Sequence, residues 1–400
     1  MQNELPQNLC EHLAKEWDVV IVGAGPAGAT AAAHLATGNR VLLLDKANFP
    51  RDKICGDGLF PDALRCLADL GIEDEVKKTG RAISTASAHS PSGARVDITG
   101  NFLTIKRRLL DAAIAKEAVA KGAVFCRGKV RCVEDTANGE GVKIWLSGVT
   151  SPFHARLCLL ATGADITLAK QTGMINNPAP QAIALRCYVK SDFPLDRLIL
   201  FYMADILPGY CWIFPLRDNW FNIGCGSIKS GKNPNLRDVF HKFTKTFPPA
   251  QKLMRYRTAE MSPLQGAMIR SGLAGSRQLQ ERNILLLGEN AATTFPSTGE
   301  GVGKAMQSGV IAASVARKYL NLGQDCLDEY SRIIRSQFGP LFQKHERAGK
   351  WMANPWLNEL IIRSARKSAS LRRKIAGILE EKISPDEVFS FSAIVRSLFH

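Results

Sequence analysis

The sequence feature that most constrains this chain is a short apolar run followed at once by closely spaced glycines. Residues 18–30 read DVVIVGAGPAGAT, with Gly23, Gly25 and Gly28 at G-x-G-x-x-G spacing. A continuous apolar run of this kind is typical of a buried parallel strand. The first glycine permits a tight turn, the second leaves room for a pyrophosphate, and the third allows a helix to pack closely on the strand. The pattern therefore predicts a strand, a turn and a helix that together bind a dinucleotide.

The residues after the glycines strengthen this prediction. The small-residue run Ala29–Ala33 is expected to be helical, and the free N–H groups and dipole of this helix favour phosphate at its N-terminus. A second apolar strand is predicted over residues 40–44 and leads to Asp45. An acidic residue about twenty positions after the glycines is expected to hold a ribose hydroxyl. The alternative is a glycine turn in an ordinary α/β unit, but the strand, glycines, helix, second strand and acid together favour a dinucleotide site.

The overall charge narrows the classes of partner. The formal net charge is +15, which would attract nucleic acid, an anionic membrane, an acidic protein or a phosphorylated substrate, or would serve solubility alone. No nucleic-acid-binding signature accompanies this charge, so we expect no nucleic-acid partner. The N-terminal residues are polar and mixed in charge, unlike a secretory signal, and no uninterrupted apolar segment is long enough to span a bilayer. We therefore expect a cytoplasmic protein, with attachment to a membrane surface as an alternative.

The cysteines and histidines give no indication of a metal site. The ten cysteines contain no C-x-x-C pair, and the seven histidines are scattered without ligand-type spacing. We therefore expect no structural metal. Reduced thiols are the default expectation for a cytosolic protein.

The order of the predicted elements indicates an α/β protein whose first domain is interrupted. The chain of 400 residues is long enough for two or three domains. Four strands with hairpin-like spacing favour a separate antiparallel sheet, and they cover residues 181–189, 198–203, 209–214 and 221–228. A late strand at 283–287 and a small-residue helix at 303–320 look like a return to the first domain. The other segments are predicted as helices at 61–70, 103–122 and 235–247, a hairpin at 83–98, and strands at 124–133, 142–146 and 156–161.

Four segments of the chain form a distinctive set: the glycine unit with Asp45, FPRDKICGDGL at residues 49–59, LPGYCWIFPL at 207–216 and LGENAATTFPSTGEGVGKA at 287–305. They resemble the geranylgeranyl reductase family of flavoproteins, which includes menaquinone reductases and belongs to the wider p-hydroxybenzoate hydroxylase-like group. The second and third segments are the most specific, because they separate this family from generic flavoproteins. The resemblance extends over most of the chain, up to about residue 320.

The resemblance implies an FAD cofactor and assigns residues to its parts. The glycines, Pro26, Ala27, Asp45 and Lys46 would surround the AMP half. Arg107 precedes Leu110-Asp111, as in the family's R-x-x-[LF]-D element, and would lie beside the phosphate–ribityl region. Gly288 and Glu289 would approach the ribityl chain, although the family's usual Gly-Asp is Gly-Glu-Asn here. Gly299, Gly301 and Val302 would bring backbone N–H groups near the pyrimidine edge of the flavin.

The implied domain organisation is a Rossmann-type FAD-binding domain with an inserted antiparallel-sheet substrate domain and a helical C-terminal region. Residues 1–80, 98–178 and 268–322 are assigned to the FAD-binding domain. Residues 81–97 and 179–267 are assigned to the substrate domain, and residues 323–400 to the basic helical region.

The resemblance also implies a catalytic set near the flavin ring. Cys55 and Asp57 would position the substrate or deliver a proton; the alternative is an ordinary turn in which Cys55 is a small buried hydrophobe. Tyr210, Trp212 and Phe214 alternate along the sequence, so they share one face of a strand. They would wall an apolar substrate tunnel, or else form the aromatic core of the sheet.

The activity implied by the resemblance is FAD-dependent reduction of carbon–carbon double bonds in an isoprenoid, either a prenyl lipid or a prenyl quinone. The alternative is an FAD-dependent monooxygenase that hydroxylates an aromatic substrate, such as an aromatic side chain of a partner protein. No second G-x-G-x-x-G lies between a strand and a helix, so NAD(P)H or another external electron donor would bind transiently. The segment 344–374 mixes apolar and cationic residues, which favours a helix on an anionic membrane, a helical cap, or a docking surface for an acidic protein.

Overall fold

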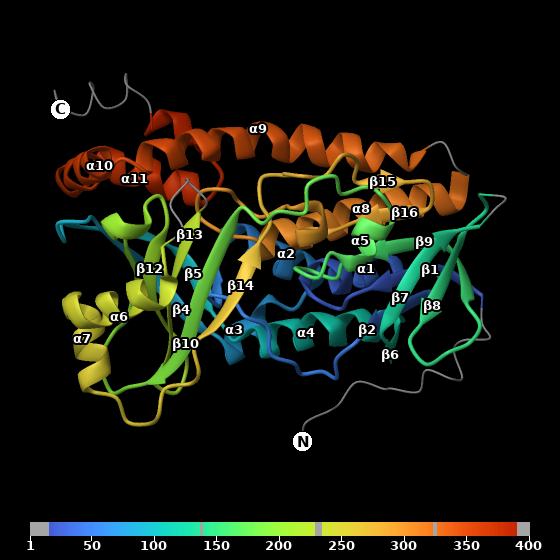
Figure 1. Ribbon diagram of the computed structural model, residues 1–400, viewed down its shortest axis with the longest axis horizontal. Coiled ribbons are helices and arrows are strands. Elements are labelled where there is room, and N and C mark those ends of the chain that lie inside the picture. Colours follow the sequence, from blue (N-terminus) through green and yellow to red (C-terminus); the bar gives the residue numbers. More distant parts are fainter. Residues whose placement is uncertain (1–15, 137–138, 229–233, 323–325, 390–400) are drawn as a thin grey trace.

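Two eight-stranded sheets lie side by side in the computed structural model, and the C-terminal helices run across one side of both (Figure 1). The structure describes residues 16–136, 139–228, 234–322 and 326–389. The predictions made for residues 1–15 and 390–400 lie outside this range.

The first sheet is built around parallel strands in the order β16-β9-β1-β2-β6. Their bounds are β1 Trp17–Val22, β2 Val41–Asp45, β6 Val124–Arg127, β9 Phe153–Leu160 and β16 Ile284–Leu286. Antiparallel strands extend the sheet, and these are β7 Val130–Asp135, β8 Val142–Leu146 and β15 Gln280–Glu281. The residues of β2 are all buried, in agreement with its continuous apolar sequence, and α1 (Pro26–Leu35) packs against it. The late strand β16 thus joins the first sheet.

The helix after the first strand packs unusually close to a helix from late in the chain. Helix α1 (Pro26–Leu35) lies against α8 (Val302–Leu322). A Cβ atom at Gly309 of α8 would lie 2.4 Å from the carbonyl oxygen of Ala27. Small residues on α1 therefore bring the cofactor turn and the late helix into direct contact.

The second sheet has the order β14-β10-β13-β12-β11-β4-β5-β3, and every pairing except β11 with β4 is antiparallel. Its strands are β3 Gly58–Leu59, β4 Arg81–His89, β5 Arg95–Thr104, β10 Ala182–Lys190, β11 Leu198–Phe201, β12 Tyr210–Pro215, β13 Trp220–Ile228 and β14 Gln265–Ile269. Helices α6 (Leu236–Thr246) and α7 (Pro248–Arg255) pack against one face through Phe240, Phe243 and Leu253. The opposite face is directed toward the first sheet.

The remaining helices frame the two sheets. They are α2 Pro61–Leu70, α3 Glu73–Thr79, α4 Arg107–Ala120, α5 Thr167–Gln171, α9 Asp328–Met352, α10 Pro355–Lys367 and α11 Ala369–Leu379. Helix α10 packs on β5, where Ile362 and Ala365 contact Val96 and Ile98. None of the helices within the described residues is both long enough and apolar enough to cross a membrane.

The predicted fold class is confirmed, whereas two predicted element boundaries are wrong. The helix expected from residue 103 begins at Arg107, because β5 continues to Thr104 and pairs there with both β4 and β3. The strand expected over 124–133 is divided into β6 and β7, because Gly128 turns away and donates its N–H to the Asp45 carbonyl. The exact domain boundaries stay predictions.

Candidate functional site

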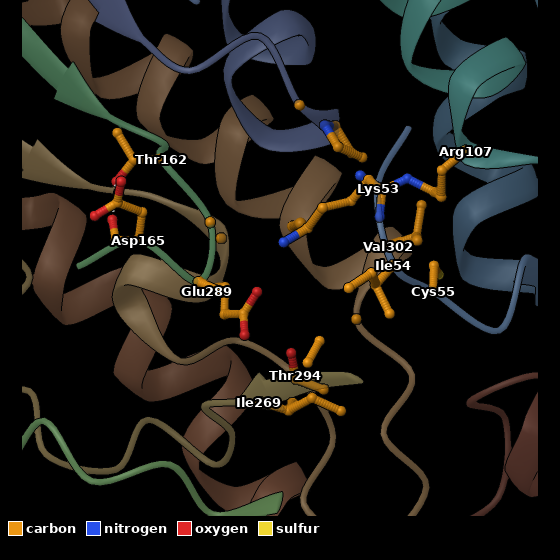
Figure 2. Close-up of a pocket in the computed structure, with 18 of the residues that line it drawn as sticks. Lys53, Ile54, Cys55, Arg107, Thr162, Asp165, Ile269, Glu289, Thr294 and Val302 are labelled. Carbon is orange, nitrogen blue, oxygen red and sulfur yellow. Dashed lines mark hydrogen bonds between the residues drawn. The ribbon is translucent and has the colours of Figure 1, made fainter. Parts of the chain in front are cut away.

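A cavity of about 1070 Å³ lies between the two sheets and is lined by residues from both. The C-terminal ends of β1 and β2 contribute one wall, β10, β12 and β13 contribute another, and the loop before α8 forms part of the lining. Figure 2 shows side chains pointing into this space from the loop of residues 46–60, from the end of β9 and from the late loop. A site at the C-terminal edge of parallel strands is the usual ligand position in doubly wound folds.

All four predicted catalytic residues line this cavity, as does every predicted cofactor residue except Gly28. Gly28 lies beneath the turn, where an added Cβ would be 1.9 Å from the carbonyl oxygen of Gly23. Gly23 itself has a φ of +106°, a conformation that L side chains rarely adopt. The two glycines therefore shape the turn, and Gly25, Pro26 and Ala27 face the cavity.

Asp45 is held rigidly at the end of β2. Its Oδ2 accepts a hydrogen bond from the N–H of Ala24 at 2.9 Å, and its Oδ1 accepts one from the N–H of Ala47 at 3.0 Å. The neighbouring Lys46 forms an ion pair with Asp165, with 2.9 Å between Nζ and Oδ2. This arrangement ties the end of β2 to the loop after β9 and leaves a fixed carboxylate in the wall.

Cations line the part of the cavity next to Asp45. Arg107 forms a two-pronged ion pair with the buried Asp111, at 2.7 Å and 2.9 Å. Arg51 also reaches Asp111, with 3.2 Å between Nη1 and Oδ2. Lys53 points into the cavity from the same loop (Figure 2). Such a group of cations suits the phosphates of a dinucleotide, and the sequence analysis did not single out Arg51 or Lys53.

The late loop between β16 and α8, residues 287–301, contributes backbone groups and two carboxyls to the cavity lining. Gly299, Gly301 and Val302 line the cavity at the N-terminus of α8, where the N–H groups of the first helical turn and the helix dipole favour electron-rich atoms. The N–H of Gly299 itself donates to the Phe295 carbonyl at 3.1 Å. Burial raises the pKa of Glu289 above its usual range. Burial also raises the pKa of Glu300 to about 8, helped by the charges of Asp62 and Glu381.

Asn290 joins this loop to the first sheet and was not predicted. Its Oδ1 accepts a hydrogen bond from the N–H of Thr162 at 2.9 Å, and its Nδ2 donates to the carbonyl of Gly163 at 2.9 Å. Gly288, two residues earlier, has a φ of +57°. A Cβ atom added at Gly288 would lie 3.0 Å from the Cβ of Ala27. The Gly-Glu-Asn sequence therefore fixes the spacing between the late loop and the first turn.

Asp57 is the most constrained residue of the cavity wall. Only 1% of it is exposed, and its φ is +64°. Its Oδ2 accepts hydrogen bonds from the hydroxyl of Tyr188 at 2.7 Å and from Nδ2 of Asn222 at 2.8 Å. Its Oδ1 accepts one longer bond, 3.3 Å from the N–H of Arg107. Burial raises the pKa of Asp57 to about 6 despite these bonds.

The aromatic residues of β12 form the wall opposite the cofactor turn. Tyr210, Trp212 and Phe214 all line the cavity and also belong to a buried apolar cluster, so the two interpretations of their alternation describe one surface. Trp212 Nε1 donates to Asn222 Oδ1 at 2.9 Å. The same Asn222 donates to the carbonyl of Cys55 at 2.8 Å. The aromatic wall and the Cys55–Asp57 loop are thus joined through one amide.

The donor and acceptor groups of the cavity fit FAD. The N-terminus of α1 and nearby cations suit a pyrophosphate, the Asp45 carboxylate suits ribose hydroxyls, and the N-terminus of α8 suits the oxygen-bearing edge of a flavin. Among the described residues, no group of histidine, cysteine or acidic side chains has an arrangement that holds a metal ion.

Comparisons with known proteins agree with this fit. Residues 16–339 match a family model described as an FAD binding domain. The chain is 32% identical over 327 residues to a menaquinone reductase of Mycobacterium tuberculosis, a match that covers 74% of this chain and 76% of that protein. It is 25% identical over 360 residues to digeranylgeranylglycerophospholipid reductase 2 of Methanosphaera stadtmanae, covering 84% and 88%.

Two solved structures show the same fold. A geranylgeranyl bacteriochlorophyll reductase-like protein from Thermoplasma acidophilum matches with a TM-score of 0.76 at 20% identity, covering 96% of each chain. A flavin-dependent brominase matches with a TM-score of 0.71 at 19% identity, covering 96% of this chain and 98% of that one.

We expect Asp45→Asn to weaken FAD binding by about 10- to 100-fold, because one charged hydrogen-bond acceptor is lost while the side chain keeps its size. The measurement is a fluorescence titration of the apoprotein with FAD. Asp69→Asn on the exposed face of α2 removes the same charge and serves as the control. Equal FAD affinity in wild type and Asp45→Asn would contradict the assignment of Asp45 to the ribose.

Proposed function

Because the chain belongs to the geranylgeranyl reductase family of FAD-dependent oxidoreductases, we propose that it reduces carbon–carbon double bonds of an isoprenoid chain. This proposal rests on one observation, that a single cavity has two chemically different parts. One part holds the turn, carboxylate and cations that fit FAD, and the other is an aromatic wall next to the buried acid Asp57. An apolar chain lying on that wall would place its double bond between the flavin and an acid.

The chemistry requires a hydride for one alkene carbon and a proton for the other. Reduced FAD, when bound, supplies the hydride. Tyr210, Trp212 and Phe214 orient the apolar chain and exclude water from the reacting carbons. No nicotinamide-binding domain was identified in the sequence, so we propose that NAD(P)H or another external donor binds transiently to reduce the flavin.

Asp57 is proposed to hold the proton. Its Oδ2 already accepts two short hydrogen bonds, whereas Oδ1 accepts only the longer bond from the Arg107 N–H. The proton therefore resides best on Oδ1. Cys55 lies in the same loop and lines the cavity together with Arg107, and we propose that it contacts the substrate beside the reacting bond.

Delivery of an apolar substrate is proposed to occur at a membrane surface. Ile183 and Met268 are paired across β10 and β14 at the edge of the cavity, and Met268 is 61% exposed. The high positive charge of the chain complements an anionic bilayer. Helix α10 adds the exposed Trp356, although its Ile362 and Ala365 are covered by β5. An acidic protein partner is the competing explanation for the charge.

The proposed reaction predicts the behaviour of the reduced protein without oxygen. Dithionite-reduced protein mixed anaerobically with a geranylgeranyl compound should return to the oxidised yellow form, and the product should gain two hydrogens at a double bond. Flavin absorbance and mass spectrometry of the product measure both events. A strict requirement for dioxygen, with an oxygen atom added to an aromatic substrate, would instead support a monooxygenase and end the proposal.

The role of Asp57 predicts a pH dependence of this step. Since its pKa is raised to about 6, the acid is protonated below that pH and lost above it. The rate of anaerobic flavin reoxidation by substrate should be constant below about pH 6 and then fall roughly tenfold per pH unit. Asp57→Asn should lower the rate by about 10²- to 10⁴-fold and abolish this dependence.

The control for this measurement is Asp62→Asn. Burial also raises the pKa of Asp62 to about 6, but Asp62 does not line the cavity, so this variant should keep the wild-type pH profile. A fall centred near pH 8 in the wild type would point to Glu300 as the proton donor and would rule out Asp57.

The membrane proposal predicts a role for the apolar edge of the cavity. Met268→Gln should reduce binding to vesicles that contain anionic lipid by several-fold, because an exposed apolar side chain no longer enters the interface. Leu322→Gln at the end of α8 is the matched control, since Leu322 is 76% exposed and lies outside the cavity lining. Vesicle sedimentation gives the bound fraction, and equal loss in both variants, or no binding at all, would refute this surface.

A further inference from the structure

Arg186 is a buried cation that the proposed reaction does not use. It lies on β10, lines the cavity, and is only 3% exposed. Its Nε has no hydrogen-bond partner in the part of the chain that the structure describes. Arg107 is neutralised by Asp111 and Lys304 by Glu381. The buried Arg270 forms no ion pair with a described residue but donates to the backbone carbonyls of Asn290 and Ala274. Arg186 has no such ion pair with any described residue.

The described surroundings of Arg186 keep the guanidinium in place but accept no hydrogen bond from it. Its central carbon lies 4.2 Å from the centroid of the Tyr188 ring, and Lys106 Nζ lies 4.9 Å from the same centroid. The Tyr188 hydroxyl donates to Asp57, whose carboxyl is already occupied by two further hydrogen bonds from Asn222 and Arg107. Stacking on a ring uses the face of a guanidinium and leaves its N–H donors free at the edge.

Burial of an arginine that forms no hydrogen bond or ion pair is costly, because the stacking on Tyr188 and the attraction to the Asp57 carboxylate replace only part of its hydration. That cost is removed when a ligand brings a negative group with planar or tetrahedral oxygens, which match the forked donors of arginine. The rest of the nearby wall is apolar, with Ala184 on the same strand face and Trp212 and Gly226 beside it. A ligand that fits both features has an acidic end and an apolar body.

We infer that Arg186 binds an anionic oxygen group, either phosphate or carboxylate, at the head of the substrate's apolar chain. The chain would then continue along Trp212 and Tyr210, which are level with Arg186 and Ala184 across β13, toward the edge formed by Ile183 and Met268. This inference rests on the proposed function and extends it, since it selects acidic isoprenoid lipids over a neutral prenyl quinone as the substrate class.

Binding of simple amphiphiles to the FAD-loaded protein tests this inference separately from the reaction. The probes are decyl phosphate, decanoate and decanol, each below its critical micelle concentration, followed by geranylgeranyl phosphate and geranylgeraniol. Isothermal titration calorimetry gives the Kd of each. The variants are Arg186→Met and Arg186→Lys, and the control is Arg255→Met on the exposed surface of α7, which removes the same charge away from the cavity.

The wild type should bind at least one of the two acidic decyl compounds about tenfold or more tightly than decanol, since a charge-assisted pair with arginine is formed. Arg186→Met should reduce this preference to less than twofold with decanol affinity unchanged. Arg186→Lys should retain part of it, and Arg255→Met should behave as wild type. A larger gain with decyl phosphate would identify a phosphate head group, and a larger gain with decanoate would identify a carboxylate.

The outcomes separate this inference from the proposed function. No acidic preference in the wild type, or full preference in Arg186→Met, would overturn the Arg186 site even if geranylgeraniol is reduced. An acidic preference that depends on Arg186, without reduction of any geranylgeranyl compound, would uphold the site and overturn the reductase. If Arg186→Met does not fold, the wild-type comparison and the partial loss in Arg186→Lys decide the question.

Discussion

The cavity depends on the hydrogen bonds that the Asp57 carboxyl accepts between the two sheets. Tyr188 and Asn222 are directly paired residues on the neighbouring strands β10 and β13, and both donate to the same oxygen of Asp57. The third donor is the backbone N–H at the start of α4. Burying a carboxyl is unfavourable unless it is hydrogen-bonded, so these three bonds are what allow the loop of residues 46–60 to cross between the sheets. That crossing brings the Cys55 carbonyl, the aromatic wall and the cofactor turn together.

The parts of this site that could be predicted from the sequence lie in contiguous motifs. Gly23, Gly25 and Asp45 are recognisable because a local turn and the strand after it impose their spacing. Arg186, Tyr188 and Asn222 could not be found in this way, because their roles arise from the register of two strands that are far apart in the sequence. The sequence pattern that predicts a strand is the same whichever polar residues lie on its cavity face. The division of the predicted 124–133 strand likewise depends on a contact with Asp45, which no local pattern contains.

The C-terminal helices contact the start of α8, which lines the cavity. Lys304, near the start of α8, is almost fully buried and pairs with Glu381 in the turn after α11, with 2.7 Å between Nζ and Oε1. The ammonium also lies over the rings of Phe295 and Phe338. An ammonium enclosed by aromatic rings requires a paired carboxylate. The loop of Gly299–Val302 is therefore supported by residues that sequence reasoning assigned to a separate basic region.

The contribution of β16 and α8 to the first sheet has a consequence for biosynthesis. Ile284–Leu286 pairs with the end of β9, and α8 covers α1, yet both segments leave the ribosome long after the glycine turn. Until then a nascent chain carries an open parallel edge at Cys158–Leu160 and an uncovered apolar helix. Such surfaces are prone to aggregation and are protected in cells by chaperones. The FAD site is therefore incomplete until the start of α8, which supplies part of its lining, has been synthesised.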